Sequence, residues 1–114
     1  MTQDLTHYIG GARVPGTSGR FSDVYNPATG EVQARCPLAS PDELARAVEI
    51  AAEAQPAWAA TNPQRRARVL MSFVHLLNRD MDKLAEALSR EHGKTLPDAK
   101  GDVQRGLEVV EYCI

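Results

Sequence analysis

Arg105 is the residue of this sequence whose type and surroundings best fit a binding role. In a helix it lies about 200° around the axis from Val103, an apolar position, so its side chain should point away from the buried stripe. Gly101 and Gly106 stand close by, and each costs a helix about 1 kcal/mol relative to alanine, which suggests that something approaches closely. A guanidinium can hold a carboxylate through two parallel hydrogen bonds. The alternative is a surface arginine paired with Glu108, three residues further along the helix.

The other chemically active residues do not form a catalytic, cofactor or metal site. Gly93-Lys94-Thr95 looks like the end of a phosphate-binding loop, but that motif needs a glycine where Leu88 stands. The sequence also lacks a dinucleotide-binding fingerprint and a nucleophile elbow. The histidines do not have metal-ligand spacing with one another or with the cysteines: they are His7, His75 and His92. We therefore predict no catalytic, cofactor-binding or metal-binding residue in this chain.

Composition excludes several classes of partner. The formal net charge is −2 over 114 residues, which does not favour nucleic acid or anionic lipid. The sequence contains no secretion signal and no apolar run of the roughly 20 residues that a membrane span needs. Cys36 and Cys113 are far apart, which suits reduced thiols in the cytoplasm. We expect Cys36 to be a small buried apolar group rather than a nucleophile.

Residues 1–38 have the pattern of short strands and turns. Residues 7–9 and 12–14 predict a tight hairpin around Gly10-Gly11. The segment Asn26-Pro27-Ala28-Thr29-Gly30 is a strong turn signal. Residues 31–36 alternate polar and apolar, as a half-buried strand does, and Pro37 should end that strand.

Residues 39–114 predict four helices. Ser40 with Glu43 forms a capping box. We expect the other helix starts to be capped by Asn62, Asp80 and Thr95. Gly93 should end the third helix in the left-handed conformation, and Pro56 should bend or end the first helix near Gln55. The predicted buried face of the first helix consists of Leu44, Ala47, Val48, Ala51, Ala54 and Trp58.

The last helix stops on an apolar turn without a capping residue. Its stripe consists of Ala99, Val103, Leu107, Val110 and Ile114. A natural domain rarely closes in this way, so we expect a piece of a longer protein. The alternative is a stand-alone helical binding or scaffold module without catalysis. The reading frame after Ile114 would distinguish the two.

The order of several motifs resembles the start of an aldehyde dehydrogenase. The motifs, taken from Tyr8 onward, are Asn26-Pro27-Ala28-Thr29-Gly30-Glu31-Val32, Ala39-Ser40-Pro41, Ala47-Val48, Ala51-Ala52, Trp58, Pro63-x-x-Arg66, Leu70 and Glu91-x-Gly93-Lys94-Thr95. The run from Gly101 to Glu111 resembles the coenzyme-A-acylating branch of that family, which acts on semialdehydes that carry a carboxylate.

The resemblance implies a fold and an activity. The parent enzyme would have an α/β fold, of which residues 1–114 form the N-terminal segment, and the cofactor and catalytic domains would lie outside this segment. It would oxidise methylmalonate or malonate semialdehyde with NAD and coenzyme A, giving propionyl-CoA or acetyl-CoA. Only Arg105 matches a residue with a substrate role, holding the carboxylate of the semialdehyde. Cys113 falls within the last helix and is not the nucleophile. The segment alone should bind no cofactor, lack activity and self-associate.

Overall fold

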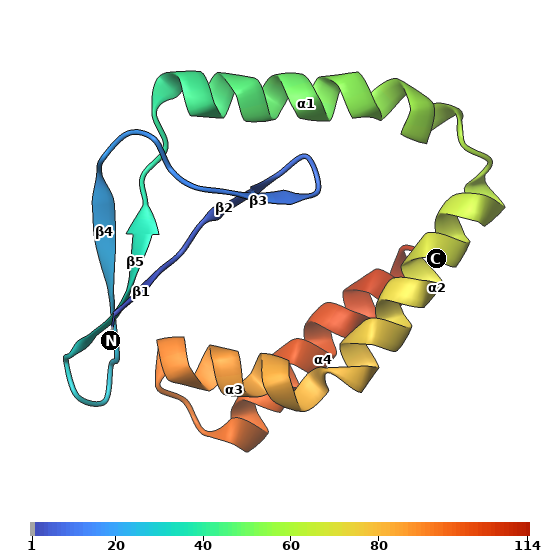
Figure 1. Ribbon diagram of the computed structural model, residues 1–114. Helices are drawn as coiled ribbons and strands as arrows, with labels where there is room; N and C mark the ends of the chain where they lie inside the picture. The colour runs from blue at the N-terminus through green and yellow to red at the C-terminus, as the bar shows by residue number, and fades with distance from the viewer. Residues whose placement is uncertain (1) are drawn as a thin grey trace. The chain divides into compact units, whose positions relative to one another are not determined.

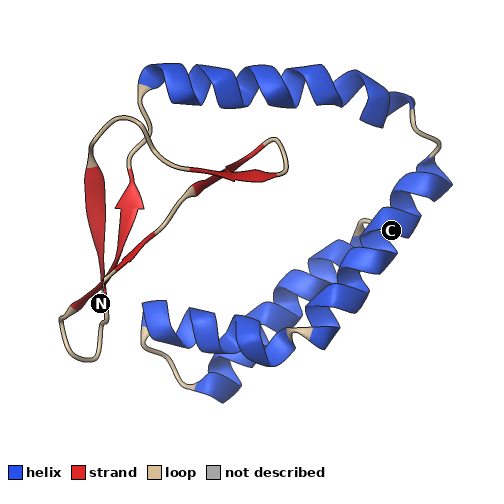
Figure 2. Cartoon of the chain, in the orientation of Figure 1, coloured by secondary structure: helices blue, strands red, loops and turns tan. Residues whose placement is uncertain are grey.

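The computed structural model describes residues 2–114, which form short strands followed by helices (Figures 1 and 2). This order confirms the predicted strand-and-turn region followed by four helices. The strands are β1 (Gln3–Asp4), β2 (His7–Ile9), β3 (Ala12–Val14), β4 (Phe21–Tyr25) and β5 (Val32–Pro37). The helices are α1 (Pro41–Ala60), α2 (Pro63–Arg79), α3 (Met81–His92) and α4 (Leu96–Tyr112). The chain divides into two compact units, residues 1–60 and residues 61–114.

The predicted hairpin and the predicted turn are both present in the first unit. β2 pairs antiparallel with β3, and the turn residues Gly10 and Gly11 have φ of 61° and 78°, values that residues with a Cβ rarely adopt. The turn between β4 and β5 closes through a hydrogen bond of 2.8 Å from the Gly30 N–H to the Asn26 carbonyl. The Asn26 side chain also accepts a bond of 2.9 Å from the Ala28 N–H, as asparagine does at the start of many turns.

A second sheet has the strand order β1-β5-β4, with β1 parallel and β4 antiparallel to β5. Asp4 on β1 faces Arg35 on β5, and their side chains form a two-point ion pair with distances of 2.8 and 2.9 Å. The Arg35 guanidinium also lies 4.9 Å from the centre of the Phe21 ring on β4. Arg35 therefore links all three strands. Cys36, in contrast, is exposed, so the prediction of a buried thiol was wrong; both cysteines are free.

Helix α1 begins as predicted but differs in its length and burial. The capping box is formed: the Ser40 N–H donates to Glu43 Oε2 at 2.7 Å, and the Glu43 N–H donates to Ser40 Oγ at 3.2 Å. Pro56 lies inside a helix that continues to Ala60, so of the two predicted outcomes, a bend or an end near Gln55, the end does not occur. The helix can tolerate this proline because the carbonyl that it leaves without a donor is on an exposed segment, where water can replace the lost bond.

The predicted buried face of α1 was also wrong for this chain. The helix contains no buried residue, and Leu44, Val48 and Trp58 are exposed. Spacing identifies which side of a helix is apolar, but it does not identify the segment that covers that side. The described part of the chain supplies little cover for this face.

The second unit consists of α2, α3 and α4, and two of its four predicted boundary residues, Asn62 and Gly93, make the expected cap. The Asn62 side chain accepts from the Gln64 N–H at 2.9 Å, and Gly93 has φ of 84°. Thr95 occupies the N-cap position of α4 in an extended conformation, without a side-chain cap bond.

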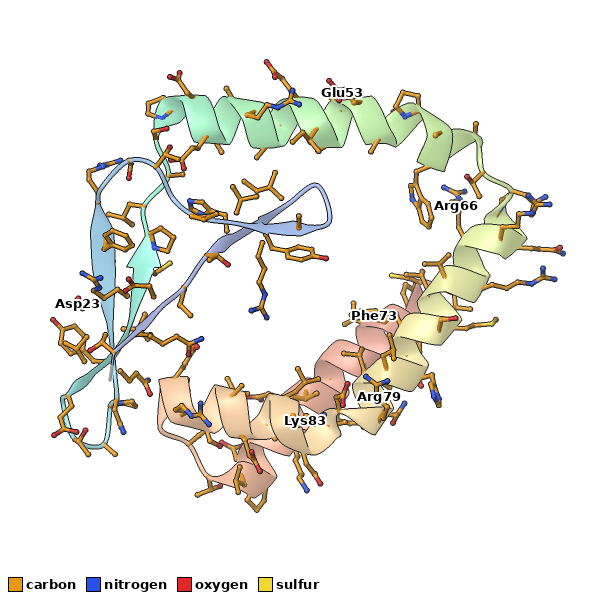
Figure 3. The ribbon with its side chains drawn as sticks, in the orientation of Figure 1. Asp23, Glu53, Arg66, Phe73, Arg79 and Lys83 are labelled. Carbon is orange, nitrogen blue, oxygen red and sulfur yellow. The ribbon has the colours of Figure 1, made fainter. Side chains whose placement is uncertain are left out.

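Asp80 precedes α3, but its carboxylate does not cap the helix. It binds Arg79 and Lys83 instead, the labelled neighbours in Figure 3. These bonds, first that from Arg79, lower the pKa of Asp80 to about 2.

The core of the second unit lies where α3 and α4 pack side by side (Figure 1). Ala85 on α3 and Ala99 and Leu107 on α4 are buried. The small alanine side chains allow the two helices to approach closely. This packing fixes which side of α4 is covered and which side remains open. No helix among residues 2–114 is long and apolar enough to cross a membrane.

Glu43 holds three segments of the first unit together. Its Oε1 accepts from the Thr17 N–H at 2.7 Å and lies 4.0 Å from His7 Nε2, while its Oε2 accepts from the Ser40 N–H. The backbone donors, first Ser40 and then Thr17, lower the pKa of Glu43 from 4.5 to about 2.

The low pKa of Glu43 predicts a specific acid sensitivity. A carboxylate whose pKa is depressed by folding stabilises the folded state above its unfolded pKa of 4.5, and this contribution is lost as the pH falls from 4.5 toward 2. NMR chemical shifts of the Thr17 and Ser40 amides in the folded protein should titrate with a midpoint near the lowered pKa of about 2, and Glu43→Gln should abolish that titration. The control Glu49→Gln, an exposed residue of the same helix, should leave it unchanged. Identical titrations in wild type and Glu43→Gln would contradict the prediction.

Candidate substrate-binding face on helix α4

Arg105 lies on the open side of α4, as the spacing predicted. Its side chain is 82% exposed, whereas Ala99 and Leu107 on the same helix are buried. A Cβ built on Gly101 or Gly106 would meet no atom within 4 Å, so the close approach expected at these glycines does not come from the described residues. Val109 and Tyr112 are exposed on the same side as Arg105. This side of α4 is therefore an accessible surface with a single cation near its middle.

The partner of Arg105 differs from the expected one. The Arg105 guanidinium is 3.6 Å from Asp102 Oδ1, three residues earlier, and Glu108 instead accepts from the Gln104 side chain at 3.3 Å. Side chains in a helix lean toward its N-terminus, so an arginine more readily meets the residue three positions before it. Because Asp102 engages only one side of the guanidinium, the remaining N–H groups stay available to a ligand.

Lys94 is linked to Arg105 through Asp102, a connection that we did not predict from the sequence. Lys94 Nζ is 3.0 Å from Asp98 Oδ2 and makes a closer contact with Asp102 Oδ2. Its side chain is only 14% exposed. The signal was present in the sequence, since Lys94, Asp98 and Asp102 are spaced by four residues and Arg105 follows three later.

These contacts keep both kinds of group charged. Hydrogen bonding to Asp102 and then to Asp98 raises the pKa of Lys94, and the bond from Lys94 is the main cause of the lowered pKa of Asp102. The Lys94 ammonium is committed to these two carboxylates. Its charge is therefore already compensated by groups of α4.

Another concave surface of the second unit lies away from Arg105. It is a groove of about 470 Å³ lined by Asp82, Glu86, Leu96, Pro97 and Lys100. An ion pair of 2.7 Å between Lys100 Nζ and Asp82 Oδ1 already satisfies its cation. The described residues contain no cluster of three or more potential metal ligands. Arg105 thus combines an exposed position with hydrogen-bond donors that Asp102 leaves unused, which suits an anion.

Comparison with known proteins places this chain in a family. A model described as the aldehyde dehydrogenase family matches residues 14–114. The chain belongs to the aldehyde dehydrogenase family. The family resemblance noted in the sequence is therefore confirmed, and the strands followed by four helices correspond to an N-terminal segment of such an enzyme.

The similar proteins include semialdehyde dehydrogenases. The acylating, mitochondrial methylmalonate-semialdehyde dehydrogenase of Arabidopsis thaliana is 45% identical over 113 residues, covering 99% of this chain and 19% of that aldehyde dehydrogenase. Malonate-semialdehyde dehydrogenase of Pseudomonas aeruginosa is 45% identical over 109 residues, covering 96% of this chain and 22% of the relative.

A solved structure matches the fold of this aldehyde dehydrogenase segment closely. It is that of a Sinorhizobium meliloti protein assigned as a methylmalonate-semialdehyde dehydrogenase, in complex with NAD. The identity is 66% and the TM-score is 0.96, over 98% of this chain and 23% of that chain. This chain therefore spans about a fifth of the length of the aldehyde dehydrogenases that it matches.

Proposed function

We propose that this chain is part of an NAD-dependent, coenzyme-A-acylating semialdehyde dehydrogenase. The enzyme oxidises methylmalonate or malonate semialdehyde and yields propionyl-CoA or acetyl-CoA. The observation that carries this proposal is the 66% identity, over 98% of the chain, to a protein assigned as a methylmalonate-semialdehyde dehydrogenase. The names of the Arabidopsis and Pseudomonas relatives support the same substrate class.

Within that enzyme, Arg105 binds the carboxylate of the semialdehyde. The open side of α4, the exposed guanidinium and the donors left free by Asp102 all support this role. Lys94, the cation of the Gly93-Lys94-Thr95 segment, is bound by two carboxylates, which supports a site for NAD and coenzyme A outside these residues. We therefore assign cofactor binding and the covalent chemistry to the part of the enzyme that corresponds to the remaining length of the relatives. To residues 1–114 we assign a structural role and recognition of the substrate carboxylate. The proposed location is the cytoplasm.

The assay of this function compares the full-length enzyme with the isolated chain. The full-length enzyme should produce NADH when supplied with methylmalonate semialdehyde, NAD and coenzyme A. The isolated chain should show no turnover, since it offers no nucleophile in a suitable setting and no cofactor site. Turnover by the rigorously purified chain would refute the division of roles. Absence of turnover by the full-length enzyme would favour a binding or scaffold module.

We also propose that the chain associates with copies of itself and that the full-length enzyme is a homo-oligomer. Helix α2 carries an exposed apolar stripe at helical spacing, formed by Val69, Phe73 (Figure 3) and Leu76. Sedimentation of the isolated chain should therefore show species larger than a monomer as its concentration rises. Phe73→Ser should weaken this association, whereas Ser72→Ala, the neighbouring exposed position, should not. A clean monomer at high concentration would count against the proposal.

A further inference from the structure

The carboxylate of Asp102 lies between two cations, the nearly buried Lys94 and the exposed Arg105. Its Oδ2 contacts Lys94 Nζ, and its Oδ1 lies 3.6 Å from the guanidinium of Arg105. The side chain of Lys94 is 14% exposed and that of Arg105 is 82% exposed, so the carboxylate connects a nearly buried charge with a surface charge.

Lys94 makes this bridge stiffer than an ordinary surface ion pair. An exposed pair three residues apart on a helix is usually loose, because both long side chains keep their freedom. Here, the ammonium lies in the short connection that follows Gly93, and it is held by Asp98 as well as Asp102. Lys94 therefore fixes the position of Asp102 Oδ2, and this orients Asp102 Oδ1 toward Arg105.

We infer that Asp102 is a positioning residue for Arg105 and contributes to specificity for aldehydes that carry a carboxylate. This inference rests on the proposed function of Arg105. Asp102 holds one side of the guanidinium, so the other side is presented to the substrate in a restricted set of orientations. Ordering the arginine before the substrate arrives removes part of the entropic cost of binding.

The carboxylate also has an opposing electrostatic effect. A negative charge near Arg105 weakens the attraction of a second carboxylate, so removing it would by itself tighten substrate binding. Lys94 balances part of this charge, although it is shared with Asp98. We expect the positioning effect to be the larger of the two, so the loss of Asp102 should weaken substrate binding.

The experiment compares Asp102→Asn with Asp98→Asn in the full-length enzyme. Both variants remove a carboxylate partner of Lys94, but only Asp102 contacts Arg105. Asp102→Asn should raise KM for methylmalonate semialdehyde by about 3- to 10-fold, the effect of losing the preorganisation of one long side chain. Its kcat, and both constants for propionaldehyde, should be unchanged. Asp98→Asn, which only loosens Lys94, should raise the semialdehyde KM less than Asp102→Asn does and should leave both constants for propionaldehyde unchanged.

Two further variants separate positioning from a structural role. Asp102→Glu keeps a carboxylate and should recover part of the lost affinity. In an Arg105→Ala background, Asp102→Asn should have no further effect on the semialdehyde KM, since there is no guanidinium left to position. An equal loss with both aldehydes, an unchanged KM, or a lower KM in Asp102→Asn would overturn the inference.

The same series distinguishes this inference from the proposed function. If Arg105→Ala raises the semialdehyde KM while Asp102→Asn leaves it unchanged, only the positioning role fails. If Arg105→Ala leaves the preference between semialdehyde and propionaldehyde unchanged, the substrate role of Arg105 fails and the positioning role fails with it.

Discussion

Arg105→Lys in the full-length enzyme should reduce kcat/KM for methylmalonate semialdehyde by about 30- to 1000-fold. The loss of a charge-assisted pair in a partly enclosed site costs about 2–4 kcal/mol, which corresponds to this range of rates. Lysine keeps the charge but cannot reproduce the planar two-point contact of a guanidinium with a carboxylate. Steady-state kinetics with NAD and coenzyme A at saturation provide the measurement.

The loss should be selective, and this selectivity separates recognition from general damage. Propionaldehyde lacks the carboxylate and should react almost as in wild type. Glu108→Gln provides a matched control, because Glu108 lies on the same helix as Arg105 but interacts with Gln104. It should leave the ratio of the two efficiencies unchanged. If Arg105→Lys also leaves that ratio unchanged, Arg105 is a surface residue and the chain contributes scaffold only.

Leu107→Ala should destabilise the second unit by about 2–4 kcal/mol. Leu107 is 2% exposed and lies on the covered side of α4, so truncation removes apolar contacts and leaves a cavity. A loss of this size is large for so small a core, because the free energy of unfolding of whole domains is only about 5–15 kcal/mol. Urea unfolding of the chain followed by far-UV circular dichroism should show the loss as a lower midpoint.

Val109→Ala is the matched control for this loss of stability. It makes a similar change two residues further along α4, but Val109 is 64% exposed. Substitutions at exposed positions usually change stability by less than about 0.5 kcal/mol. Equal shifts in the two variants would show that Leu107 does not belong to the core of the second unit.

Local chemistry was sufficient to predict most element boundaries from the sequence. The capping box of Ser40 and Glu43, the Asn62 cap and the left-handed Gly93 each depend on a few consecutive residues. The Gly10-Gly11 turn is of the same kind. Such features do not require knowledge of the rest of the fold.

The burial of side chains and the choice of ion-pair partners were less predictable. Burial depends on segments far away in the sequence, and partner choice depends on which neighbouring groups compete for the same side chain. Leu44 and Val48 have the spacing of a covered face, but the described part of this chain does not bury them. Asp80 was expected to cap α3, yet Arg79 and Lys83 compete for its carboxylate. For Arg105, the sequence indicated the open side of α4, while the direction in which helical side chains lean decided its partner.

The parallel pairing of β1 with β5 imposes an order of assembly on the first unit. β4 and β5 are joined by residues 26–31 alone, whereas Asp4 and Arg35, which face each other across the β1–β5 pair, are 31 residues apart. The entropic cost of closing a chain loop grows with its length, by about 0.6 kcal/mol for each doubling. The antiparallel pair of β4 and β5 should therefore form first. The free edge of β5 is then available to pair with β1. β1, although it precedes both strands in the sequence, is then the last of the three to pair, and Asp4 secures its register by engaging Arg35.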